Sequence, residues 1–221
     1  MSQINFKGET IMKLIVFEGL DGSGKTTLIQ KIKEKLQAQN QEVMTLQGLG
    51  SSSIGPKIRK IFLTRKNLAN QTRYLLSFAN MIQTQEEILI PLSKTNTIIL
   101  IDRWLGSNFA YRVYPYPNNT NYQFFNLLSK CFIQPAMTIY LKTTPEIGLH
   151  RKQNQPHHQI DVIESSPIAY FQKVAQGYEE FFKRNNLGIK LMLNATDFTN
   201  IEPQQKHIIE KIGAIINGYH H

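Results

Sequence analysis

The stretch FEGLDGSGKTT, residues 17–27, places three glycines, a lysine and two threonines between an apolar run and an amphipathic one. Gly19 is followed after four residues by Gly24, Lys25 and Thr26, which is the spacing of the phosphate-binding P-loop. In such a loop the backbone N–H groups surround phosphates, the lysine reaches the outer phosphates and the threonine hydroxyl binds magnesium. The spacing therefore favours a nucleotide phosphate site over a glycine turn that only caps a helix.

Around this loop, short apolar runs alternate with amphipathic ones. The short runs predict buried strands from their length and polar flanks, and they lie at 13–18, 42–46, 97–101, 136–142 and 188–193. The longer runs predict helices from apolar residues at three- and four-residue spacing, and they lie at 26–39, 55–64, 68–90, 122–132, 145–151, 167–184 and 203–216. This alternation predicts a parallel sheet covered on both faces, with ligands beyond the carboxyl ends of its strands. We therefore expect an α/β fold of the P-loop NTPase type, with three α/β/α layers and a five-stranded parallel sheet built from the five short runs.

Composition limits the partners. With 221 residues, 41% of them hydrophobic, the chain is long enough for one domain with a full core. Lys and Arg number 25 against 16 for Asp and Glu, and this formal charge of +9 favours polyanionic partners such as nucleotides, nucleic acid or an anionic membrane surface. Basic residues do not alternate with aromatics in a stripe, which counts against nucleic acid. The charge alone does not choose among these partners, and it is the P-loop spacing that favours small-molecule nucleotides.

Cysteine content and hydropathy indicate the compartment. Cys131 is the single cysteine, so no intrachain disulfide and no cysteine-based metal cluster can form. The longest apolar runs, such as 14–17 and 98–101, are far shorter than the ~20 residues of a membrane span, and no signal-peptide core precedes them. We expect a cytoplasmic protein without membrane segments.

The loop also carries Asp21 between its glycines, and GLDGSGKTT resembles the P-loop of the thymidylate kinases. The resemblance continues through most of the chain after Met12, in IILIDR (98–103), DRWLGSNFAYR (102–112), EEILIPL (86–92), HRKQNQPHHQIDVIE (150–164) and LNAT (193–196). It implies a core sheet, a region that grips a nucleoside monophosphate, and a mobile lid over ATP at about 151–162. It also implies one kinase-like P-loop domain over 12–221, whereas residues 1–11 lack apolar periodicity and are expected to form a flexible extension.

The resemblance implies transfer of the γ-phosphate of ATP to a deoxynucleoside monophosphate, with thymidylate (dTMP) as the first choice of acceptor. ATP and Mg²⁺ are the implied cofactors, and a homodimer through the helix expected at 68–90 is implied as well. In-line phosphoryl transfer spreads negative charge over the moving group, so it needs cations beyond the P-loop lysine and magnesium. Ser23 stands where some family members carry an arginine, so Arg151 and Lys152 in the lid are expected to supply that cation.

The resemblance assigns roles to single residues. Those assigned to the donor nucleotide are Gly19, Gly22, Ser23, Gly24, Lys25, Thr26, Thr27 and Arg151, with Thr26 and Asp102 on the metal. Those assigned to the acceptor are Asp21, Arg59, Phe78, Arg103, Ser107 and Tyr111, and those assigned to catalysis are Lys25, Asp21, Arg103, Arg151 and Lys152. Simpler roles stay open for four of them: Asp21 bonding its own turn, Asp102 capping a helix, Arg103 in solvent and Tyr111 in the core. His157 and His158 are interpreted as solvated lid residues, because no third metal ligand of suitable spacing accompanies them.

Several positions depart from the family pattern on the acceptor side. After the second strand the family has an R-E-P-G-G-like turn, whereas this sequence has Gln47 followed by glycines, so an acceptor-site arginine is missing. In the next helix Met81 stands where the family has an arginine at the base, and the preceding aromatic is shifted by one position to Phe78. Loss of a charge-assisted hydrogen bond worth ~1.5–3 kcal/mol relaxes the choice of base. Arg112 and Val162 depart from the pattern in the same direction.

Three classes of function stay open from the sequence. The first is a deoxynucleoside monophosphate kinase, with thymidylate as the favoured acceptor. The second is a related P-loop kinase that acts on another nucleotide or on a nucleoside. The third is a non-catalytic nucleotide-binding paralogue or a nucleic-acid-stimulated ATPase, which the altered acceptor region and the charge of +9 permit.

Overall fold

We analysed a computed structural model of the chain. It describes residues 12–156, 160–197 and 201–217. The extension expected at 1–11 and the pair His157 and His158 lie outside the described residues. None of the helices in those three ranges is long and apolar enough to cross a membrane.

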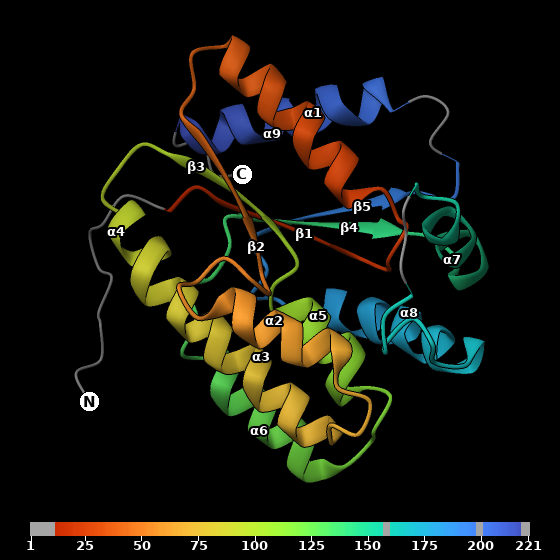
Figure 1. Cartoon of the computed structure of the whole chain (residues 1–221). Coiled ribbons are helices and arrows are strands. Elements are labelled where there is room, and N and C mark those ends of the chain that lie inside the picture. Colours follow the sequence, from red (N-terminus) through yellow and green to blue (C-terminus); the bar gives the residue numbers. More distant parts are fainter. Residues whose placement is uncertain (1–11, 157–159, 198–200, 218–221) are drawn as a thin grey trace.

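The centre of the fold is a five-stranded parallel sheet in the order β2-β3-β1-β4-β5 (Figure 1). The strands are β1 (Leu14–Gly19), β2 (Val43–Gln47), β3 (Ile98–Asp102), β4 (Met137–Lys142) and β5 (Ile189–Asn194). Each lies within one residue of the expected range at its carboxyl end, and the predicted fold class is confirmed. In the register of the sheet, Asp102 pairs with Phe17 on one side and with Gln47 on the other. The ends of β1, β2 and β3 therefore meet at one edge.

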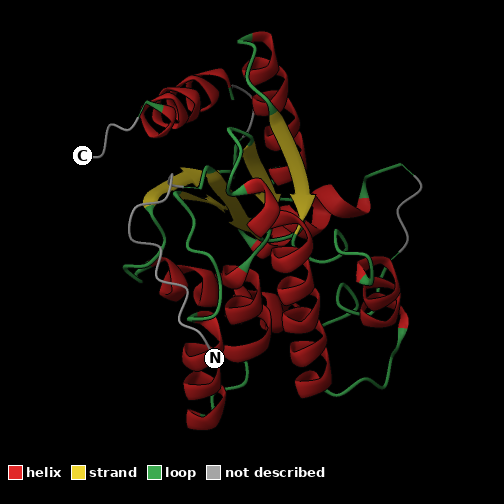
Figure 2. Cartoon of the chain, turned by 90° about the vertical axis from the view of Figure 1, so that its left-hand side faces the viewer, coloured by secondary structure: helices red, strands yellow, loops and turns green. Residues whose placement is uncertain are grey.

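Helices cover both faces of the sheet (Figures 1 and 2). One face is covered by α1 (Lys25–Ala38) and α9 (Glu202–Ile216), whose apolar residues pack on Ile15, Phe17 and Ile139. The opposite face is covered by α2 (Gly55–Thr64), α3 (Asn70–Thr84), α5 (Leu105–Asn108), α6 (Asn119–Ser129) and α8 (Ile168–Phe182). The shorter α7 (Pro145–Gln153) follows β4 and lies beyond the carboxyl ends of the strands. These are the three layers expected from the sequence.

The helix expected at 68–90 is a composite. After α3 the chain makes one π-helical turn, η1 (Gln85–Leu89), and a last short turn, α4 (Ile90–Leu92). Gln85 is held at this point from outside the helix, because its amide donates to the carbonyl of Cys131 (3.0 Å) and accepts from the N–H of Ile133 (2.8 Å). The wider turn accommodates a side chain that serves as a tether to the loop before β4.

The helical segment directly after β3 was not predicted from the sequence. It consists of α5 and a π-helical turn, η2 (Phe109–Val113). All of its residues except Ser107 are buried, including the polar Asn108 and Arg112, so no exposed polar face stands opposite an apolar one. A helix that is buried on every side has no apolar stripe at 3.6-residue spacing, and the sequence pattern therefore gives no signal.

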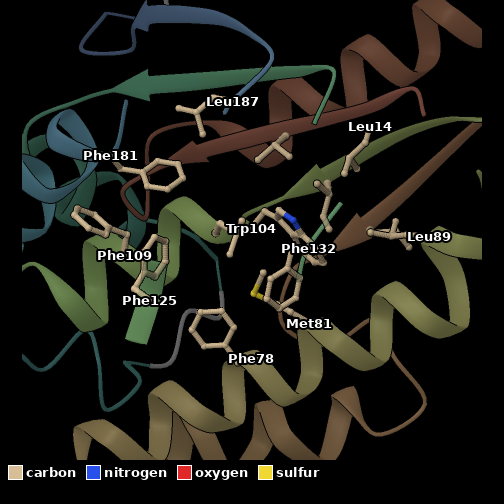
Figure 3. Packing of buried hydrophobic residues seen from close by; sticks show 14 of the residues in the cluster. Leu14, Phe78, Met81, Leu89, Trp104, Phe109, Phe125, Phe132, Phe181 and Leu187 are labelled. Atoms are coloured by element: carbon tan, nitrogen blue, oxygen red, sulfur yellow. The ribbon is translucent and has the colours of Figure 1, made fainter. Parts of the chain in front are cut away.

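Aromatic residues fill the space between α3 and the sheet (Figure 3). Phe78 and Met81 point from α3 towards Trp104 and Phe132, and all four side chains are buried. The ring of Phe132 lies 5.5 Å from that of Phe78 and 5.6 Å from that of Trp104. This cluster fixes the distance between α3 and the end of β3.

We predict that Phe78→Ala lowers the free energy of unfolding by about 3–5 kcal/mol, because it removes a ring that is 2% exposed and leaves a cavity. Leu127→Ala on α6 is the matched control, since Leu127 is 63% exposed and its truncation should cost under about 0.5 kcal/mol. Urea unfolding of the two variants measures the difference. Equal midpoints for both would contradict this place for Phe78 in the core.

Candidate active site

The loop between β1 and α1 has the conformation of a phosphate-binding turn. Gly22 and Gly24 have φ angles of +72° and +89°, in the left-handed region that favours glycine. A Cβ atom on Gly22 would lie 2.0 Å from the carbonyl oxygen of Gly148, so α7 approaches the loop closely enough to exclude any side chain there. Gly19 and Ser23 are buried beneath the loop. The loop thus presents backbone at the start of α1.

Lys25, the first residue of α1, is 5% exposed. Its Nζ donates to the carbonyl oxygens of Leu20 (2.8 Å) and Gly19 (3.1 Å). Burial, and next the positive charge of Arg103, lower the pKa of Lys25 to about 8, although Asp102, Asp21 and Glu18 act in the opposite direction. The ammonium is therefore near enough to the second cation to be affected by it, and an anion between them would stabilise both.

Thr26 and Asp102 come together at the carboxyl ends of β1 and β3. The Thr26 hydroxyl donates to Asp102 Oδ2 (3.2 Å), whereas Asp102 Oδ1 is buried and accepts no hydrogen bond from the described residues. The described residues contain no cluster of three or more His, Cys, Asp or Glu side chains that could hold a metal. Magnesium usually takes one or two carboxylates and completes its shell with phosphates and water. A hydroxyl beside a carboxylate with a free oxygen fits that ion.

Arg103 follows β3 directly and has a left-handed φ of +72°. Its Nη2 pairs with Asp21 Oδ1 (2.8 Å), and its Nη1 donates to the hydroxyls of Tyr178 (2.6 Å) and Ser107 (3.1 Å). Its guanidinium carbon lies 5.3 Å from the ring centre of Tyr111, whose hydroxyl donates to Asp21 (3.1 Å). Burial alone would raise the pKa of Asp21, but the charges of Arg103 and Lys25 outweigh it and hold that pKa well below its usual range. The structure thus brings together four of the predicted site residues.

Two further residues of this cluster, Glu18 and Tyr178, were not selected from the sequence. Glu18 is 1% exposed and accepts hydrogen bonds from the Trp104 N–H (2.8 Å) and the Ser107 hydroxyl (2.7 Å). Burial raises its pKa although those hydrogen bonds and Arg103 lower it. The carboxyl group inside the apolar strand LIVFEG could have indicated a site residue, because a buried charge needs a partner. Tyr178 gave no signal, since it continues the apolar stripe of α8.

A cleft of about 520 Å³ opens at this edge of the sheet. Residues from the P-loop, the end of β3, the helices on one face and the 152–164 segment line it. The lining includes Asp21, Lys25, Thr26, Arg59, Phe62, Ser77, Met81, Asp102, Arg103, Ser107, Asn108, Tyr111, Arg112 and Lys152. A second hollow of about 330 Å³ is lined by Gly22, Gly24, Thr27, Lys31, Arg151, Asp197 and Ile201. Gly22, Gly24 and Thr27 line both, so the P-loop lies between the two hollows.

The two predicted lid cations lie in different spaces. Arg151 lines the second hollow, and its guanidinium donates to the carbonyl oxygens of Ala195 (2.7 Å) and Thr196 (2.8 Å). Lys152 lines the main cleft, where its Nζ lies 3.9 Å from Glu164. Only Lys152 is therefore in the same space as Arg103.

Of the residues predicted to bind the acceptor, Arg59 lines the main cleft and Phe78 does not. Arg59 lines the cleft and donates to the Leu49 carbonyl (3.0 Å), but Phe78 is packed in the core and is outside the set of described residues that line it. The lining residues of α3 are instead Ser77 and Met81, one position before and three positions after Phe78. The aromatic ring at this end of the cleft is Phe62 on α2, which sequence analysis did not select.

Arg112 forms the wall beside Phe62. It is 5% exposed, and its guanidinium carbon lies 4.8 Å from the centre of the Phe62 ring. Its Nη1 is 3.5 Å from the Asn70 amide oxygen, and its Nε is buried without a partner in the described chain. The substitution noted in the sequence thus puts a cation at the far end of the cleft.

A parallel sheet, a glycine-rich turn that opens a helix at its carboxyl edge, and a buried lysine in that turn define the class of P-loop NTPases. The thymidylate kinase family model matches residues 17–202. Thymidylate kinase of Acholeplasma laidlawii is 33% identical over 176 residues, covering 76% of this chain and 86% of that protein. Those of Chlorobaculum parvum and Acinetobacter baumannii are each 30% identical, and the alignments cover 88% and 82% of this chain and 91% and 92% of those proteins.

The chain therefore belongs to the thymidylate kinase family, which consists of ATP-dependent nucleoside monophosphate kinases. Use of ATP and of nucleotide substrates follows from that membership.

We predict that ATP binding takes up a proton above pH 8. The free protein loses the Lys25 proton around its pKa of about 8, whereas bound phosphates raise that pKa because they favour the charged form. The Kd for ATP should therefore rise from pH 8 upward, by as much as about tenfold per pH unit, and stay nearly constant below pH 7. Calorimetry in two buffers of different ionisation enthalpy measures the uptake.

Lys25→Ala should abolish both the proton uptake and the turnover while the protein stays folded. Proton uptake that persists in this variant would show that another group takes up the proton.

Proposed function

We propose that the protein transfers the γ-phosphoryl group of ATP to a deoxynucleoside monophosphate, with dTMP as the acceptor. The observation that carries this proposal is the position of Arg103 in the same cleft as Lys25, Thr26 and Asp102. A P-loop alone needs only the donor groups. A second cation, an arginine at the end of the neighbouring strand, supplies a site for a second phosphate, which a monophosphate kinase requires and a simple ATPase does not.

On the donor side, the N–H groups of the loop bind the ATP phosphates and Lys25 neutralises the outer ones. Thr26 and Asp102 would hold magnesium, which would neutralise charge on the phosphate oxygens. The hollow on the other side of the loop suits the nucleoside part of ATP, with Arg151 and Lys31 at its wall. Arg151 then binds the donor, and Lys152 is the lid cation that stabilises the moving phosphoryl group.

On the acceptor side, Arg103 binds the monophosphate. In the free protein its guanidinium is paired with Asp21, so the acceptor phosphate shares that cation with a carboxylate. Tyr111 holds the other oxygen of Asp21 and keeps the carboxylate turned towards Arg103. Positioning two phosphates in line between Lys25 and Arg103 is the main contribution of the protein, because the transition state of phosphoryl transfer is stabilised by placement and charge.

The base occupies the end of the cleft lined by Phe62, Met81, Asn108 and Arg112. The Asn108 amide nitrogen has the Met81 sulfur as its partner (2.8 Å), and a thioether is a weak acceptor. Arg112 is a donor only. Two donors at this end favour a base with carbonyl oxygens over one with an exocyclic amino group. The thymidylate kinase names of the relatives support dTMP among such bases.

A homodimer and a cytoplasmic location belong to the same proposal. Leu75 and Ile82 on α3 are 52% and 41% exposed, and a second copy packed on this helix would cover them. This is the helix through which a dimer was expected from the sequence.

The first experiment is a nucleotide panel of dTMP, dUMP, dGMP, dCMP and dAMP with ATP and Mg²⁺ in a coupled assay of ADP release. We expect the highest kcat/KM for dTMP and values at least about tenfold lower for dCMP and dAMP, because an amino group facing Asn108 and Arg112 leaves donors unpaired. Activity on a purine above that on dTMP would replace the proposed acceptor. Silence with every monophosphate would leave a nucleotide-binding protein without kinase activity.

We predict that Arg103→Ala reduces kcat/KM for the acceptor by about 2–4 kcal/mol of transition-state stabilisation and leaves ATP affinity nearly unchanged. Arg103→Lys should recover only part of the loss, because an ammonium cannot reproduce the planar guanidinium. Arg65→Ala is the matched control, since Arg65 is exposed and lies outside the residues that line the cleft. Initial rates with each substrate varied in turn measure the two effects. Loss of ATP affinity with unchanged acceptor affinity would show that Arg103 binds ATP and not the acceptor.

A further inference from the structure

We propose that Tyr178 is a positioning residue for Arg103. Together with Ser107 and Glu18 it forms a hydrogen-bonded chain that fixes the guanidinium where the acceptor phosphate binds. This inference rests on the proposed function, because it assigns Arg103 to the acceptor. Tyr178 itself acts through the arginine.

The chain runs from the sheet to α8 in three short steps. The Ser107 hydroxyl is 2.7 Å from Glu18 Oε2 and 2.8 Å from the Tyr178 hydroxyl. The Tyr178 hydroxyl is in turn 2.6 Å from Arg103 Nη1. Glu18 is also fixed by the Trp104 N–H (2.8 Å), so the chain ends at a buried carboxylate that is itself held in place.

The direction of each hydrogen bond follows from the two ends. Arginine can only donate, so the Tyr178 oxygen accepts from Arg103 and its proton must go elsewhere. It goes to Ser107, whose own hydroxyl donates to Glu18 Oε2. Each hydroxyl then donates one hydrogen bond, and all donation runs from Arg103 towards the Glu18 carboxyl group. A chain with a single allowed direction holds its members in one arrangement.

The chain also determines which donors Arg103 keeps for a ligand. Of the five N–H groups of the guanidinium, contacts with the described residues use one for Asp21, one for Tyr178 and one for Ser107. The remaining two are available to a phosphate. Without Tyr178 and Ser107, Asp21 would be the main partner, and the guanidinium would be free to turn both amino groups towards that carboxylate in a bidentate pair. The chain therefore opposes the competing arrangement that would occupy the cation.

Packing delivers the Tyr178 hydroxyl to this point. Its ring stacks on Tyr140 (5.4 Å between centres) and meets Tyr111 edge-on (6.1 Å). The preceding residue is Gly177, where a Cβ atom would lie 2.9 Å from Ala110 Cα and from Tyr114 Cβ. The glycine thus lets α8 approach η2 closely, and the aromatic neighbours fix the ring that follows it.

Tyr178 remains a neutral hydroxyl in this position. Burial raises its pKa well above the usual value, and Glu18 and Tyr111 add to that effect although Arg103 and Ser107 oppose it. A hydroxyl that keeps its proton cannot serve as a base, which agrees with a positioning role.

The test compares Tyr178→Phe with Tyr140→Phe. Both variants remove one hydroxyl from buried, stacked rings, but only Tyr178 contacts Arg103. For Tyr178→Phe we expect the Kd and KM for dTMP to rise about five- to twentyfold, as for loss of a hydrogen bond to a charged group, with the KM for ATP within about twofold of the wild type. For Tyr140→Phe we expect an unchanged KM for dTMP. Melting temperatures of both variants control for general destabilisation.

A double variant separates the chain from a single contact. If Tyr178 and Glu18 act in one chain, Tyr178→Phe combined with Glu18→Gln should weaken dTMP binding by less than the product of the two single effects. Equal KM values for dTMP in Tyr178→Phe and the wild type, or equal losses in Tyr178→Phe and Tyr140→Phe, would overturn the proposal. Multiplicative effects in the double variant would overturn the chain.

Calorimetry with dTMP alone distinguishes this inference from the proposed function. A wild type that binds dTMP without transferring phosphate contradicts the proposed function, while the Kd of Tyr178→Phe still tests the positioning role. A wild type that transfers phosphate while Tyr178→Phe behaves identically contradicts only the positioning role. A wild type that neither binds nor phosphorylates a monophosphate overturns both.

Discussion

The arrangement of the site depends on one backbone hydrogen bond beyond the end of β3. Asp102 is the last strand residue, yet the N–H of Arg103 still donates to the carbonyl of Phe17 (2.9 Å), so the ladder continues for one residue after the strand has ended. The chain then turns away through the left-handed φ of Arg103, a conformation that costs a side-chain-bearing residue of order 1–3 kcal/mol. The bond between Trp104 N–H and Glu18 secures that turn. The left-handed φ of Arg103 redirects the backbone directly after Asp102, and both residues line the cleft.

The charges of the site are balanced within the protein before any ligand arrives. Lys25 is surrounded by loop carbonyls, and Arg103 is held by Asp21, Tyr178 and Ser107. Phosphates would approach Lys25 and the two remaining N–H groups of Arg103 without a large movement of either cation, and an arrangement of this kind avoids reorganisation at the moment of reaction. It also gives Asp21 a role between the glycines, since Arg103, whose side chain is only 22% exposed, needs a fixed counter-charge when no phosphate is bound.

The sequence predicted the sheet and the P-loop well, because both depend on local pattern. Apolar runs placed every strand to within one residue of its carboxyl end. The glycine spacing selected Lys25 and Thr26, whereas Asp102 was selected from the resemblance to the family. The helix after β3 was missed because its residues are buried on all sides and show no period. Phe78 was selected from the family pattern, but a shift of one position turns a helical side chain by about 100°. That rotation directs its ring into the core and leaves Ser77 and Met81 at the cleft. Tyr178 is far from the P-loop in sequence, and only the packing of α8 brings it to Arg103.

The proposed donor and acceptor sites differ in how many amino-acid substitutions they can accommodate. The donor side is made of backbone: its glycines have left-handed φ angles, and Gly148 approaches Gly22 so closely that no side chain fits between them. A substitution there would move α7 or the loop itself. The base end of the acceptor side is made of side chains on α2, α3 and the helix after β3, and Met81 or Arg112 can occupy its wall without altering any main-chain contact of the P-loop. The same division appears in the sequence, where departures from the family pattern fall almost entirely on the acceptor side. Because Arg103 follows the end of β3 and is held by Asp21, Ser107 and Tyr178, and not by the residues at the base end, the proposed phosphate end of the acceptor site is retained while its base end varies.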